Sequence, residues 1–250
     1  LFFSTPKPAY EILSGLVGSE MCIRDSNKAK PFPNIVVDNF INDTVAMQCF
    51  NELKGTDYWV TEDTSNAYMA PHQVSKWFTP WDAESTEQLR YTTPTVYNTI
   101  QYFNSKLFLS YLEDLTGIQG LKGDPGFSGG GAHKIRKGGK LSFHVDFNIH
   151  SETNYFRVLN LLLYLNPTWK EEWEGYLELW DKENKVCAHK IAPLFNRAVI
   201  FTLSDYSVHG HPIPLQTPPD IERYSLALYY YIEQPNQDYY ERRAVVWHEF

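Results

Sequence analysis

From Ala132 onward, strand-like segments follow one another with only turns between them, and this run constrains the fold more than any other feature. Within the segments, apolar residues either alternate with polar ones or form short uninterrupted runs, and both patterns are typical of strands in a sheet. No helix long enough to connect parallel strands separates them, so neighbouring strands are expected to run antiparallel. The predicted strands are 140–147, 158–165, 176–181, 198–203 and 223–232. We therefore predict an antiparallel barrel or jelly roll.

Helical signals occur only before this run of strands. Asn42 can cap a first helix, Pro94 suits the first position of a second, and Ser105 can cap a third that ends at Gly117. The polar and aromatic stretch 54–93 is interpreted as loops with short strands. The fold class predicted from these patterns is mainly β with N-terminal helices, in the α+β class.

The chain is expected to divide into four parts. Residues 1–26 are predicted to be foreign to the domain, because 16–26 resemble the in-frame translation of a sequencing adapter. Residues 27–131 would form a helical support region of the same domain, and 132–232 its strand-rich core. The tail, 233–250, is amphipathic at best; it could dock on the domain or promote dimerisation, and the sequence leaves the oligomeric state open.

Composition excludes several classes of function. A net charge of −8 argues against a nucleic-acid binder, which normally presents a basic face. No apolar run approaches the roughly 18 residues that a membrane-spanning helix needs. The three cysteines are widely spaced, which favours neither a disulfide framework nor a zinc site and fits a reducing compartment. We expect a cytoplasmic protein with no nucleic-acid or membrane partner.

His144 and Asp146 stand two residues apart on the predicted strand 140–147. Side chains at this spacing leave the same face, roughly 6–7 Å apart at Cα, so they could share one metal ion. His209 could add a second imidazole, and two histidines with one carboxylate suit non-haem Fe(II). His211 is the competing third ligand. A histidine at the edge of the core, bonded to a nearby carboxylate, is the plain alternative for His144.

Arg223 and Ser225 share a face of the last predicted strand. A guanidinium that points into a barrel needs an anion, and a ligand carboxylate held by two N–H bonds would supply it. Ser225 could add a hydroxyl bond. A salt bridge to Glu178 is the structural alternative. Asn160 and Tyr164 share a face of an otherwise apolar strand. This pattern indicates either a barrel interior lined with polar groups or a tyrosine whose hydroxyl reaches water at the mouth of the barrel.

Taken together, these motifs resemble the 2-oxoglutarate/Fe(II)-dependent dioxygenases: His-x-Asp, a distal His, then Arg-x-Ser on a late strand. Residues 138–148 resemble the prolyl-4-hydroxylase-like branch of that superfamily, as do 163–169 and 193–201. The similarity covers about residues 31–232.

The resemblance implies a double-stranded β-helix, the jelly-roll or cupin-like core of that family, at 132–232. It also implies a catalytic set, in which Fe(II) is held by three ligands and 2-oxoglutarate by its far carboxylate. The implied iron ligands are His144, Asp146 and His209, and the implied cosubstrate contacts are Arg223, Ser225 and Tyr164. Family chemistry couples oxidation of 2-oxoglutarate by O2, to succinate and CO2, with hydroxylation of a C–H bond, and ascorbate is the expected reductant.

The substrate is less constrained than the chemistry. Peptidyl proline is the expected target, a small molecule or glycan is the alternative, and a non-catalytic jelly-roll binding module is the alternative from another class. Two positions depart from the family pattern: Ile135 stands where a tyrosine is frequent, and Glu174-Gly175 replaces the usual Gly-Gly.

Overall fold

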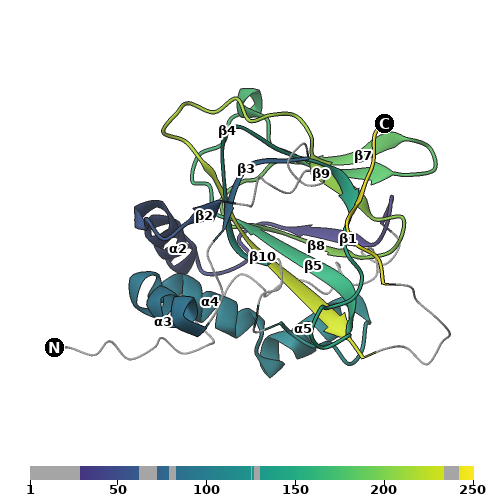
Figure 1. Cartoon of the computed structure of the whole chain (residues 1–250), viewed down its shortest axis with the longest axis horizontal. Helices are drawn as coiled ribbons and strands as arrows, with labels where there is room; N and C mark the ends of the chain where they lie inside the picture. The colour runs from purple at the N-terminus through teal and green to yellow at the C-terminus, as the bar shows by residue number, and fades with distance from the viewer. Residues whose placement is uncertain (1–28, 62–71, 79–82, 125, 127–129, 234–241) are drawn as a thin grey trace.

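The computed structural model describes residues 29–61, 72–78, 83–124, 126, 130–233 and 242–250 (Figure 1). The predicted foreign leader, 1–26, lies outside the described residues. The described strands form one curved sheet of 11 strands, whose main path runs β1-β8-β5-β10-β4-β9-β6-β7. Every pairing along this path is antiparallel, as the sequence predicts.

The strands take these bounds in chain order: β1 (Asn34–Val37), β2 (Val60–Thr61), β3 (Gln73–Phe78), β4 (Gly131–Val145), β5 (Phe156–Tyr164), β6 (Leu177–Asp181), β7 (Val186–Ile191), β8 (Arg197–Thr202), β9 (Val208–His211), β10 (Arg223–Ile232) and β11 (Val246–Trp247). The helices are α2 (Asp43–Gly55), α3 (Ala83–Thr92), α4 (Pro94–Phe103) and α5 (Lys106–Thr116), with a short 3-10 helix at Glu171–Trp173.

The long strand β4 joins the two parts of the sheet. Its first residues pair with β10, where Ile135 lies opposite Arg223. Its last residues pair with β9, where His144 lies opposite His209. Gly138 lies between these two regions at φ +80°, a left-handed conformation that glycine adopts without steric cost. β4 therefore carries His144 of the predicted metal motif, and it also pairs with the strand that holds Arg223, the predicted anion-binding residue.

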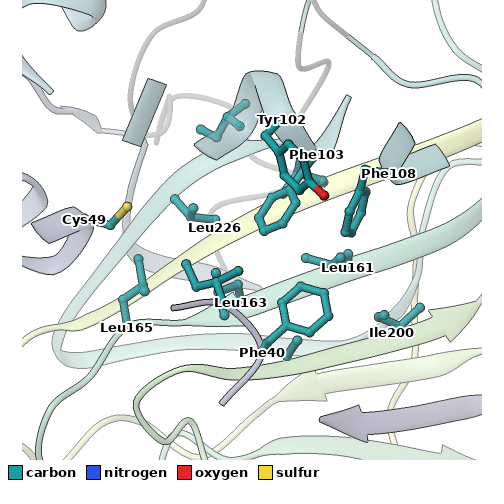
Figure 2. Packing of buried hydrophobic residues seen from close by; sticks show 14 of the residues in the cluster. Phe40, Cys49, Tyr102, Phe103, Phe108, Leu161, Leu163, Leu165, Ile200 and Leu226 are labelled. Atoms are coloured by element: carbon teal, nitrogen blue, oxygen red, sulfur yellow. The ribbon is translucent and has the colours of Figure 1, made fainter. Parts of the chain in front are cut away.

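Strand alternation separates a helix-covered face from a cavity-lining face. On β10, Leu226 and Leu228 belong to the main apolar core together with residues of α2, α4 and α5 (Figure 2). The odd-numbered residues Arg223, Ser225 and Ala227, which alternate with the buried even-numbered ones, line the cavity on the opposite face. Because side chains in a strand alternate between faces, burying the leucines against the helices turns the polar residues inward.

The predicted helix ends are confirmed. The Asn42 side chain accepts hydrogen bonds from Thr44 N and Val45 N at the start of α2. Ser105 accepts from Phe108 N at the start of α5, and Gly117 follows that helix at φ +74°. These caps satisfy backbone groups that a helix end otherwise leaves without partners.

Four elements, α3, β7, β9 and β11, were not predicted. The stretch 54–93, interpreted as loops with short strands, does contain the short strands β2 and β3, but the interpretation is wrong at α3. Only Leu89 is buried among residues 87–92 of α3, too few to make an apolar stripe. β7 exposes five of its six residues, so it has no buried face to detect. β9 is four residues long and fully buried, which is too short for a periodicity. No helix of the described parts of the chain is long and apolar enough to cross a bilayer.

Candidate active site

Three ligand-type side chains meet at the end of β4. The ligand atoms of His144, Asp146 and His209 all lie within 4.8 Å of one another, and all three residues are buried. His144 Nε2 is 3.4 Å from Asp146 Oδ1, and His209 Nε2 is 3.4 Å from Asp146 Oδ2. The pairing of His144 with His209 across β4 and β9 brings together residues 65 positions apart.

Both imidazoles are oriented in the same way. The Nδ1 atoms of His144 and His209 each lie 2.9 Å from a backbone carbonyl, that of Ser142 and Ser207 respectively. A carbonyl only accepts hydrogen bonds, so each Nδ1 carries the proton and each Nε2 presents a lone pair to the site. Burial, and then the adjacent His144 ring, lower the pKa of His209 to about 4, so this imidazole is neutral at physiological pH. Neutral imidazoles fixed through Nδ1 are the form that binds metals.

Asp146 is ionised and held by two side chains of β5. Arg157 Nη2 donates to its Oδ2 at 3.0 Å, and Asn160 Nδ2 donates to the same oxygen at 2.8 Å. Burial by itself would raise the pKa of Asp146, but Arg157 and the two imidazoles outweigh it and hold this pKa well below its usual range. Because Oδ2 already accepts two hydrogen bonds, Oδ1 is the oxygen best placed to bind a metal.

Arg223 lies in a cradle at the other end of the cavity. Its Nε donates to the carbonyl of Gly175 at 2.9 Å, its Nη2 donates to the hydroxyl of Tyr164 at 3.2 Å, and its guanidinium carbon lies 4.7 Å from that ring's centre. Burial lowers the pKa of Arg223, with Tyr164 opposing the shift, but a guanidinium remains charged. Ser225 pairs with Tyr164 across β10 and β5.

The salt bridge considered for Arg223 is not formed. Glu178 instead accepts a hydrogen bond from Trp180 Nε1 at 2.8 Å. Within the described part of the chain, no carboxylate lies within ion-pair distance of Arg223. A buried cation without a counter-ion is costly, so the site is suited to an incoming anion.

One cavity of about 270 Å³ contains both groups of residues. The three ligand-type residues line it together with Arg223, Ser225 and Tyr164, so all six predicted site residues meet in one place. His211 also lines the cavity, opposite Leu141, but the cluster of possible metal ligands contains His209 and not His211. The structure thus groups the residues as the sequence predicted and separates the two competing histidines.

Sequence reasoning missed three contributors. Arg157 was not singled out, although a charged residue three positions before Asn160, at the start of a mostly apolar strand, could have indicated a buried polar partner. Gly175 was noted only as a departure from a family pattern, yet its carbonyl binds Arg223; a Cβ there would approach Leu215 to 2.2 Å. Trp247 lines the cavity from a tail that carried no interpretable pattern.

Comparisons with known proteins agree with this geometry. Residues 130–231 match the family model described as the 2OG-Fe(II) oxygenase superfamily, a stretch that includes the three ligand-type residues and Arg223. This match spans 102 of the 250 residues and supports an enzyme of the 2OG-Fe(II) oxygenase superfamily. The family implies Fe(II) and 2-oxoglutarate, and a two-histidine, one-carboxylate cluster that could hold the metal is present. A search of curated proteins finds no match.

Several solved structures share the fold. A prolyl hydroxylase from Trichoplax adhaerens, in complex with a peptide fragment of hypoxia inducible factor, is 19% identical with a TM-score of 0.51, covering 84% of this chain and 88% of that one. A prolyl 4-hydroxylase from Phytophthora capsici is 21% identical with a TM-score of 0.55, covering 92% and 67%. HygX from Streptomyces hygroscopicus, with nickel and 2-oxoglutarate bound, is 12% identical with a TM-score of 0.51, covering 80% and 82%. The fold is therefore prolyl-hydroxylase-like.

Proposed function

We propose that this oxygenase hydroxylates peptidyl proline, using Fe(II), 2-oxoglutarate and O2 and releasing succinate and CO2. One observation carries the proposal: a single cavity contains a buried two-histidine, one-carboxylate cluster and a buried arginine that has no carboxylate partner among the described residues. Iron chemistry needs the first feature, and a cosubstrate with a free carboxylate needs the second.

The residues present fit an iron(II) ion. His144 and His209 offer Nε2 lone pairs, because carbonyls hold their Nδ1 protons, and Asp146 offers Oδ1. With only three protein ligands, a metal held here would keep further coordination positions available for a cosubstrate. When bound, the iron supplies the oxidative chemistry of the family. The protein's part is to orient the three ligands and to keep Asp146 ionised in a buried site.

The residues present also fit 2-oxoglutarate. Arg223, fixed by the Gly175 carbonyl and the Tyr164 hydroxyl, is placed to grip the carboxylate that lies away from the metal. Ser225, on the same face of β10, is placed to add a hydroxyl bond. Charge-assisted bonds of this kind are worth about 1.5–3 kcal/mol each, so Arg223→Ala should weaken 2-oxoglutarate binding at least about tenfold.

Peptidyl proline is favoured by the fold and by the sequence resemblance. The structures that share this fold include prolyl hydroxylases, one of them solved with a peptide. A small-molecule substrate is the second candidate, because HygX has a similar fold and a structure of it contains hygromycin B.

Oxygen transfer to a peptide tests the proposal. An oligoproline peptide incubated with the protein, Fe(II), 2-oxoglutarate, ascorbate and air should gain the mass of one oxygen per modified residue, as read by mass spectrometry. Asp146→Ala should give no product while the fold, followed by circular dichroism, persists. Succinate release without peptide modification would favour the small-molecule alternative. Neither succinate release nor binding of 2-oxoglutarate would indicate a non-catalytic binding module.

A further inference from the structure

The closing segment, residues 242–250, is built into the edge of the metal-binding strand. Its strand β11 runs antiparallel to β4, with Val246 opposite Val145 and Trp247 opposite His144. Paired residues in an antiparallel sheet place their side chains on the same face. Trp247 therefore faces the same side as a candidate iron ligand, whereas the side chain of Val246 faces away and is 37% exposed.

Contacts anchor the closing segment on both sides of β11. Before it, Arg243 donates from Nη2 to the carbonyl of Asp146 at 3.0 Å and forms an ion pair with Asp205. After it, Phe250 stacks on Trp180 of β6, with ring centres 4.9 Å apart and planes 4° from parallel. Figure 1 shows the C-terminal end near the β6–β7 hairpin. These anchors hold Trp247 at a defined place.

The indole of Trp247 forms part of the cavity wall at the metal cluster. Its ring centre lies 5.2 Å from that of His144, and it stacks on His72 at 4.4 Å with planes 13° apart. Val245, on the same face of the segment, also lines the cavity. The wall beside the metal cluster is thus aromatic and apolar on this side.

Arg223 and Trp247 occupy different levels along β4. Arg223 lies beside Ile135, in the first part of the strand, and Trp247 lies beside His144, near its end. A cosubstrate that reaches from Arg223 to the metal cluster would fill the first region. The region beside Trp247 is then the part of the cavity that remains for the group to be oxidised.

We propose that Trp247, presented by β11, is a specificity-determining residue that forms the substrate-facing wall of the active site. The inference rests on the proposed function. A large, rigid aromatic ring offers broad apolar contact at low entropic cost, which suits the saturated ring of a proline residue. Phe147 and Tyr229 also line the cavity, but the Arg157 guanidinium covers both rings, at 4.6 and 3.3 Å from their centres.

The position of Trp247 can be tested without turnover. Co(II), added to metal-free protein in the absence of O2 and 2-oxoglutarate, should quench the emission of an indole beside the metal site. Trp247→Phe should bind Co(II) with unchanged affinity and lose most of this metal-dependent quenching. Quenching equal to that of the wild type would overturn the inference, because Trp247 would then not be the indole beside the metal.

The role of Trp247 in specificity requires a substrate probe, and oligoproline is the one to use. Trp247→Ala should raise the KM for the peptide about tenfold, the change that about 1.4 kcal/mol of lost contact produces, and leave the KM for 2-oxoglutarate unchanged. Val246→Ala is the matched control on the same strand and should leave both constants unchanged. An equal rise of both constants in Trp247→Ala would overturn the inference, since it would show a merely structural role.

Failure of the proposed function would look different. A wild-type protein that binds Co(II) and 2-oxoglutarate but leaves oligoproline unmodified contradicts the peptide substrate. The quenching difference between wild type and Trp247→Phe then decides whether Trp247 forms the wall beside the metal.

Discussion

At the scale of single residues, the orientation of Asp146 determines what the cluster can bind. Arg157 and Asn160 both donate to Oδ2, so one carboxylate oxygen is committed to the protein. Arg157 is itself fixed, since its Nε donates to Asn160 Oδ1 at 3.0 Å and its guanidinium stacks on Tyr229. Hydrogen-bonded partners of this kind tune metal ligands and matter nearly as much as the ligands themselves.

Replacing Arg157 should therefore weaken metal binding. We expect Arg157→Met to raise the Kd for Co(II) about 10–100-fold, the usual cost of losing a partner of a metal ligand. Arg157→Lys keeps the positive charge but loses the planar guanidinium with its several N–H donors. Its Kd for Co(II) should therefore lie between those of the wild type and Arg157→Met. Anaerobic calorimetry on protein shown to be folded measures this. Arg136→Met, on an exposed residue of β4, is the control, and equal affinities in all four proteins would contradict the role given to Arg157.

Residue-level prediction from the sequence succeeded where the spacing encodes a common face. His144 with Asp146, and Arg223 with Ser225, are each two residues apart in the sequence, and each pair lines the same cavity. Arg157 could not be assigned in this way, because its partner Asp146 lies 11 positions away in the sequence, across a turn. This separation matches neither a strand nor a helix periodicity.

At the scale of elements, the turn before β8 holds the helical layer against the sheet. Asn196 is fully buried at φ +55°, and its side chain exchanges two hydrogen bonds with the backbone of Ile41 and donates to Asp43 Oδ1 at 2.7 Å. It therefore ties the start of α2 to a strand more than 150 residues later.

Asn196→Ala should lower the free energy of unfolding by about 2–4 kcal/mol, since buried groups of Ile41 would lose their partners. Urea denaturation measures the change. Asn154→Ala is the matched control: Asn154 also has a positive φ, of 57°, but is exposed, and its side chain accepts a hydrogen bond from exposed Arg242. A similar loss in both variants would indicate that backbone conformation, and not the buried bonds, stabilises the turn.

Elements with a long apolar or alternating pattern could be predicted from the sequence, and short elements without such a pattern could not. β5, β8 and β10 were predicted to within two residues at each end, because long greasy or alternating runs mark them. β7 was missed because it has no buried face, and β9 and β11 were missed because pairing partners far along the chain create them. The placement of the closing segment beside β4 likewise depends on tertiary pairing, which local sequence does not encode.

At the scale of the whole molecule, the candidate active site lies on the face of the sheet opposite the one that the helices cover. The candidate ligands come from β4, from the residue that follows it and from β9, so a bound ion would link segments far apart in the chain. An ion that binds the folded state and not the unfolded chain stabilises the fold by mass action.

Metal loading should therefore raise the melting temperature. At a Co(II) concentration of 100 times its Kd, about 2.7 kcal/mol of stabilisation corresponds to roughly 5–10 °C for a chain of this size. Differential scanning fluorimetry with and without a chelator measures the shift. His144→Ala should lose it, while His189→Ala, on exposed β7, should keep it. A shift retained in His144→Ala would place the stabilising ion elsewhere.

The most direct measurement of the central claim is succinate formation from 2-oxoglutarate, with Fe(II), ascorbate and air, by the wild type and by His144→Ala. We expect succinate from the wild type even without a substrate and none from His144→Ala, although both are folded. Equal succinate formation by the two proteins would contradict the assignment of the iron site. No succinate from a wild type that binds both metal and 2-oxoglutarate would contradict catalysis in the absence of substrate.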